Sequence, residues 1–88
     1  MRSLCRVLDV SNQGLKITSH ERLPPGTLLY LEFPATFDER PLTLMGEVVW
    51  VRAGEGVSAP HEVGILFKEA PRDAGTIISG MEIHALTA

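Results

Sequence analysis

Apolar and polar side chains alternate along much of the chain before residue 69. Residues 15–18 alternate strictly, and residues 27–33 and 62–68 also carry an apolar residue at every second position, although a few of the intervening residues are apolar as well. A period of two places those side chains on one face of a β-strand. Residues 4–9 are a further apolar-rich run, and residues 42–52 form the longest segment of this kind. The pattern therefore predicts five strands.

Turn-forming residues separate these segments. Ser-Asn-Gln-Gly at residues 11–14 and Leu-Pro-Pro-Gly at residues 23–26 are of this type, and the loops over residues 34–41 and 54–60 are rich in polar residues, Pro and Gly. Such residues favour turns because they bond nearby backbone groups or adopt backbone angles that others avoid. Gly46 lies inside the longest segment, where an isolated glycine predicts a bulge or a close backbone approach.

The period changes after Phe67. Pro71 and Asp73 are residues that favour the first turn of a helix. Four apolar residues then recur near helical spacing: Ile77, Ile78, Met81 and Ala85. The spacing predicts an α-helix over residues 71–85.

Strands joined by short loops pair most simply as antiparallel neighbours, and a sheet this small avoids exposed edges by curling into a barrel. A chain of 88 residues is long enough for one small domain. We therefore expect a mostly β fold over residues 1–88: a small antiparallel β-barrel, with its strands within residues 3–68, and a C-terminal helix that covers one end.

Composition excludes several classes of protein. The 8 Lys+Arg and 11 Asp+Glu residues give a net charge of −3, which argues against a duplex-DNA binder. No run of about 18 apolar residues exists, so we expect no membrane insertion, and the N-terminus does not resemble a secretory signal. Together with the lone cysteine, these features predict a cytoplasmic protein.

The sequence shows no catalytic or metal-binding constellation. Cys5 is the only cysteine, and we expect it to be a small buried residue. His20, His61 and His84 are far apart and lack metal-ligand spacing. Trp50 follows a valine and precedes another, which predicts a buried core residue rather than a stacking platform for a base. The sequence therefore predicts no enzyme, no catalytic residue and no metal site.

Several short motifs follow one another in a fixed order. Asp-Val-Ser-Asn-Gln-Gly at residues 9–14 leads into Leu-Lys-Ile at residues 15–17, and Pro-Gly-Thr at residues 25–27 opens the next segment. Gly-Glu-Val-Val-Trp at residues 46–50 and Val-Gly-Ile-Leu-Phe at residues 63–67 follow. In this order and spacing the motifs resemble those of the PilZ domain family: an Asp/Asn-x-Ser-x-x-Gly turn, then Gly-x-Val-x-Trp and Gly-Ile-x-Phe strands.

The resemblance implies a six-stranded antiparallel barrel with a C-terminal helix, so the strand count is five to six. Many PilZ domains are non-catalytic bacterial receptors for the second messenger cyclic di-GMP. Their ligand contacts come from an Arg-x-x-x-Arg arm and from the Asp/Asn-x-Ser-x-x-Gly turn. Carried over to this chain, these motifs give the ligand-binding residues as Asp9, Ser11, Gly14, Arg6 and Arg2, with cyclic di-GMP as a regulatory ligand and no other cofactor.

The arginine motif departs from the family pattern. Arg2 and Arg6 have the right spacing, but Arg6 is only three residues from Asp9. In the family the arginines lie upstream of the turn by a whole strand and its hairpin partner. We therefore expect five strands, with one sheet edge left open for a partner protein or a second copy of the chain.

Two functions remain open at this point. The intact turn favours a cyclic di-GMP receptor, whereas the displaced arginines favour a divergent PilZ domain that contacts proteins as an adaptor in motility, pilus or signalling machinery. Asp9, Ser11 and Gly14 are also ordinary turn residues, and Arg2 and Arg6 are ordinary exposed charges. A small enzyme is the least favoured alternative.

Overall fold

The computed structural model describes residues 2–33, 42–69 and 82–88. Six strands occupy these ranges, and they are β1 (Arg2–Val10), β2 (Gly14–Ser19), β3 (Leu28–Phe33), β4 (Leu42–Arg52), β5 (His61–Glu69) and β6 (Glu82–Thr87). Within them, no helix is long and apolar enough to cross a membrane.

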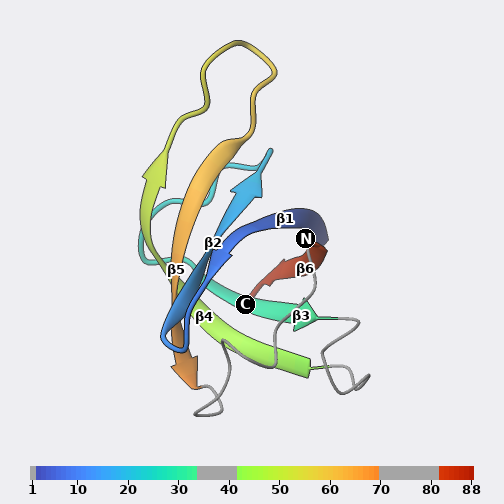
Figure 1. Ribbon diagram of the computed structural model, residues 1–88, viewed down its shortest axis with the longest axis vertical. Coiled ribbons are helices and arrows are strands. Elements are labelled where there is room, and N and C mark those ends of the chain that lie inside the picture. The colour runs from blue at the N-terminus through green and yellow to red at the C-terminus, as the bar shows by residue number, and fades with distance from the viewer. Residues whose placement is uncertain (1, 34–41, 70–81) are drawn as a thin grey trace.

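The strands form a closed barrel in the order β1-β2-β5-β4-β3-β6 (Figure 1). All the pairings are antiparallel, and every strand has a neighbour on both sides. The first and last described strands meet, because β6 lies between β1 and β3.

This closure corrects the prediction of five strands with an open edge. Residues 2–10 form a nine-residue strand, and β6 occupies the place beside it that we expected to be empty. Since both neighbours of β6 come from distant parts of the chain, local sequence did not reveal the pairing. The described strands therefore offer no free edge for strand addition or for self-association.

The predicted helix over residues 71–85 is wrong over residues 82–85, which belong to β6. Ile83 and Ala85 face the core with 0% and 4% of their surface exposed, as alternate residues of a strand do. The remainder of that prediction, residues 71–81, lies outside the described residues.

The barrel interior holds the side chains that the alternation assigned to it. Among the core residues are those from three of the predicted strands: Leu15, Ile17, Leu29, Leu31, Phe33, Val63, Ile65 and Phe67. Cys5 is also buried, as predicted, with 2% of its surface exposed. Burial, with a smaller effect from the charge of Glu21, raises the pKa of the Cys5 thiol to about 11. The thiol is therefore protonated at neutral pH and is no nucleophile.

Irregular pairing interrupts the outer face of the barrel. The register shifts by one residue at Leu8 in β1, at Val49 in β4, and at Lys68 in β5, opposite the step from Met45 to Gly46. A bulge inserts one extra residue into a strand and re-aims the side chains after it. The irregularity beside Gly46 lies in the partner strand β5, so a bulge at the glycine itself is not seen. Gly46 instead marks a close approach, the other outcome predicted for it, because a Cβ atom there would lie 2.4 Å from Ile65 Cγ2.

Candidate functional site

An open groove of about 380 Å³ lies on the outer face of the barrel. The turn between β1 and β2 forms one end of the groove, and β4 and β5 form the other. Its lining includes three of the residues that the resemblance assigned to ligand binding, Asp9, Ser11 and Gly14. The groove also contains residues that the sequence did not single out as a site.

The β1–β2 turn is held by its own hydrogen bonds. The Ser11 backbone N–H donates to the Gly14 carbonyl at 2.9 Å, and the Ser11 hydroxyl donates to that carbonyl at 3.4 Å. The same hydroxyl oxygen accepts from the Gln13 N–H at 3.2 Å. The Gln13 carbonyl in turn accepts from the Phe67 N–H at 2.8 Å, which ties the turn to β5. Ser11 thus shapes the end of the groove.

Gly14 is fixed by close packing against the next strand. A Cβ atom at this position would lie 2.1 Å from the Ile65 carbonyl oxygen, which is far inside van der Waals contact. Because the obstructing atom belongs to the backbone of β5, it cannot rotate away. Glycine at this position therefore lets the turn approach β5.

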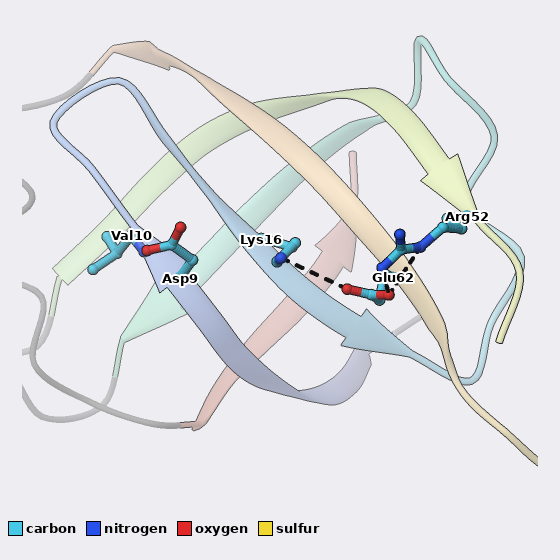
Figure 2. Close-up of polar contacts among 5 residues, drawn as sticks. All are labelled: Asp9, Val10, Lys16, Arg52 and Glu62. Atoms are coloured by element: carbon cyan, nitrogen blue, oxygen red, sulfur yellow. Dashed lines mark hydrogen bonds and ion pairs between the residues drawn. The ribbon is translucent and has the colours of Figure 1, made fainter.

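Asp9 points outward because of the shift in β1. Its Oδ1 atom accepts a hydrogen bond from the Val10 N–H at 2.9 Å (Figure 2). The residue is exposed. A carboxylate on the rim of an open groove presents acceptor oxygens to a ligand that carries N–H donors.

One row of paired residues crosses the groove on four strands. Asp9 on β1 pairs with Lys16 on β2, Lys16 pairs with Gly64 on β5, and Gly64 pairs with Trp50 on β4. All four line the groove. Neighbouring strands are about 4.8 Å apart, so the row spans about 14 Å between the outermost Cα atoms.

Trp50 lies on the surface, which corrects the prediction of a buried tryptophan. Its exposed fraction is 42%, and the shift between Val48 and Trp50 turns it outward. The indole occupies the space above Gly64, since a Cβ atom there would lie 2.1 Å from Trp50 Nε1 and 2.2 Å from Cε2. The absence of a side chain at Gly64 thus leaves room for the Trp50 ring to pack against β5.

A charged network lies beside the row (Figure 2). Arg52 Nε donates to Glu62 Oε2 at 3.0 Å, and Arg52 Nη2 bonds the same oxygen. Lys16 Nζ lies 3.7 Å from Glu62 Oε1, an ion pair longer than a hydrogen bond. The hydrogen bond from Arg52 is the main cause that lowers the pKa of Glu62, and the positive charges of Arg52 and Lys16 act in the same direction.

The two predicted arginines lie on β1 outside this row. Arg6 is exposed and is not among the groove-lining residues, and its N–H donates to Thr18 Oγ1 at 3.2 Å. Thr18 is two residues from Lys16 along β2. Arg6 therefore lies beside the next pair of strand positions whose side chains face out of the barrel, about 7 Å along the strand from the row that crosses the groove. Arg2 pairs with Leu86, about 13 Å farther along β1 than Arg6.

Sequence reasoning missed Lys16, Gly64 and the role of Trp50. The signal available was Gly64 itself, because a glycine inside a strand often marks a close approach by another group. No cluster of three or more metal-ligating side chains occurs in the part of the chain that the structure describes.

A model of the PilZ domain family matches residues 2–81. The chain therefore belongs to the PilZ domain family, as its motifs indicated. At the family level these domains are regulatory modules of the cyclic di-GMP receptor type and are generally non-catalytic. No curated protein and no solved structure matches the chain.

Proposed function

We propose that the domain is a regulatory module that binds cyclic di-GMP in the groove beside the β1–β2 turn. The observation that carries the proposal is the position of Asp9, whose exposed carboxylate lines the groove next to the family's own ligand-binding turn. Membership of the PilZ family supports the same ligand.

The chemistry of the ligand suits these groups. Guanine offers N1–H and N2–H donors on one edge, and a carboxylate is an acceptor for both. Arg6 is one outward row from the groove, and its guanidinium is the planar group that pairs with a phosphate or with guanine O6 and N7. In this proposal Asp9 takes a guanine edge, Arg6 reaches in from the rim, and Ser11 and Gly14 shape the turn.

Isothermal titration with cyclic di-GMP, using GTP as the control ligand, tests the proposal. We expect saturable micromolar binding by the parent and a loss of about tenfold or more in Asp9→Ala, because a charge-assisted hydrogen bond contributes about 1.5–3 kcal/mol. Glu55→Ala is the matched control, since Glu55 is an exposed carboxylate in the β4–β5 loop outside the groove. Equal binding by Asp9→Ala, or no heat from folded protein, would overturn the proposal.

A second function, contact with a partner protein, rests on a different observation. Among the exposed large apolar side chains are three on strands β1, β4 and β5, with exposed fractions of 43% for Leu8, 46% for Val49 and 46% for Leu66. Val49 and Leu66 line the groove itself. An adaptor would use this face rather than a strand edge, because the barrel of described strands is closed. A folded chain that binds no nucleotide favours this alternative.

A further inference from the structure

We propose that the row of residues from Asp9 to Trp50 binds one molecule of a guanine-containing cyclic dinucleotide along its whole length. In this arrangement Asp9 takes the edge of a guanine, Lys16 takes a phosphate, and the Trp50 indole stacks on the second base. The inference rests on the proposed function and adds to it the contacts at the far end of the groove and the base specificity.

The first step is the exposed indole. Trp50 is the only tryptophan in the chain, and the register shift in β4 holds it outward over Gly64. An aromatic ring with a supported underside and an open upper side is a surface on which a base stacks. The alternative is that this ring only packs against Gly64 and contacts no base. The fluorescence titration described below distinguishes the two roles, because only a stacked base quenches the indole.

The second step is the ammonium group of Lys16. Lys16 lies between Asp9 and Gly64 in the row and lines the groove. Its ion pair with Glu62 is 3.7 Å long, whereas Arg52 makes hydrogen bonds to the same carboxylate. An ammonium has three N–H donors and pairs with phosphate as a compact point charge. Lys16 is therefore a phosphate partner inside the groove, where Arg6 is not.

The third step is the order of the groups. Along the row a carboxylate is followed by an ammonium, then by a glycine that carries an indole. A cyclic dinucleotide has the same order: a base edge, a phosphate, and the face of the other base. The indole lies over Gly64, two strand spacings from Asp9, or about 10 Å between the Cα atoms of Asp9 and Gly64. A mononucleotide fills only part of this row.

The two ends of the row then differ in base specificity. Stacking on an aromatic ring tolerates any base, because every base has a π-face. A carboxylate pairs best with two adjacent donors, which guanine has at N1 and N2, whereas adenine has a donor at N6 beside an acceptor at N1 that repels the second carboxylate oxygen. The site should therefore accept the hybrid ligand cyclic GMP-AMP, with guanine at Asp9 and adenine on Trp50, and should reject cyclic di-AMP.

Titration of the intrinsic fluorescence of Trp50 with three cyclic dinucleotides tests the inference on the unmodified chain. We expect quenching that saturates with cyclic di-GMP and with the 3′,3′-linked hybrid at affinities within about threefold of each other. Cyclic di-AMP should bind about tenfold or more weakly, because adenine offers the Asp9 carboxylate one donor at N6 beside the acceptor N1, in place of the two adjacent donors of guanine. Calorimetry of the same samples reports binding independently of the indole.

Two variants complete the experiment. Lys16→Gln should weaken cyclic di-GMP about tenfold, whereas Lys68→Gln should leave it unchanged. Lys68 is the matched control because it is also an outward lysine in an ion pair, 2.6 Å from Glu47, but it does not line this groove. Trp50→Leu should lower the affinity about tenfold, as expected for the loss of one stacked base.

The outcomes separate the two proposals. Calorimetric binding of cyclic di-GMP without any change in Trp50 emission would overturn this inference and leave the proposed function standing. Equal affinity for cyclic di-AMP, or an effect of Lys68→Gln as large as that of Lys16→Gln, would overturn it as well. No binding by either method would overturn both proposals together.

Discussion

The two ends of the groove are built on two glycines that accommodate different neighbours. At the turn end, the space beside Gly14 is filled by the Ile65 carbonyl of β5. At the far end, the space beside Gly64 is filled by the Trp50 indole. One neighbour is backbone that cannot move without the strand, and the other is a surface side chain that can.

This difference suggests separate roles for the two neighbours, because one maintains the fold and the other is accessible to a ligand. The polar groups of Ser11 are satisfied within the turn, so the turn end consists largely of groups that maintain the fold. The carboxylate of Asp9 and the ring of Trp50 face the solvent, so they are available to a ligand. The family motif therefore combines residues that maintain the turn, Ser11 and Gly14, with Asp9, the residue that we propose binds the ligand.

The largest expected effect is that of Gly14→Ala. The new Cβ atom would lie 2.1 Å from a backbone oxygen, so β2 and β5 must separate. Overpacking of this kind costs about 1–3 kcal/mol of unfolding free energy, and for a domain of this size that lowers the melting temperature by about 5–20 °C. Thermal unfolding followed by circular dichroism measures the change. Gln13→Ala, in the same turn, is the control and should unfold close to the parent.

Ser11→Ala should have the next largest effect. Its hydroxyl accepts from the Gln13 N–H and donates to the Gly14 carbonyl, and both bonds lie within the turn. Loss of such bonds at the surface costs about 0.5–1.5 kcal/mol, which chemical denaturation resolves. An unchanged denaturation midpoint would mean that the serine hydroxyl does not maintain the turn, and the contrast between the two ends would weaken.

Gly64→Ala adds a Cβ atom at the far end of the groove and is compared with Gly14→Ala at the turn end. The Cβ atom displaces the Trp50 ring rather than a strand, so the free energy of unfolding should change by no more than about 0.5 kcal/mol. The emission maximum of Trp50 should nevertheless move to longer wavelength, because the ring no longer packs against β5 and becomes more hydrated. A stability loss as large as that of Gly14→Ala would contradict the assignment of this end to a movable side chain.

The smallest expected effect is the loss of folding stability at acidic pH that comes from Glu62. Arg52 and Lys16 hold the pKa of Glu62 below its ordinary value of 4.5. A carboxylate whose folded pKa is depressed contributes stability above pH 4.5, and that contribution is lost as pH falls through the folded value. Titration of the Glu62 side chain by nuclear magnetic resonance should show a midpoint below 4.5, and Arg52→Gln should raise it. A midpoint unaffected by Arg52→Gln would show that the hydrogen bond is not its cause.

Much of the barrel followed from local sequence, because alternation fixes which side chains face the core. The C-terminal strand did not, since its two partners are distant in sequence and Ala85 also fits a helical pattern when it follows Ile77, Ile78 and Met81. Long-range pairing with β1 and β3 decided between the two.

The site was predicted in part for a related reason. The resemblance identified Asp9, Ser11 and Gly14, which line the groove, and also Arg6, which does not. A strict period of two places Trp50 on the inward face with Val48, and only the register shift between them turns the indole outward. Such a shift depends on pairing with β5 and leaves little trace in the local pattern.

The most direct test of the whole account is a map of amide and indole N–H resonances during titration with cyclic di-GMP. We predict that shifts gather at the turn over residues 9–14, at Lys16 and Gly64, and at the indole N–H of Trp50. Shifts confined to the opposite strands β3 and β6, or no shifts at saturating ligand, would contradict the claim that this groove is the binding site.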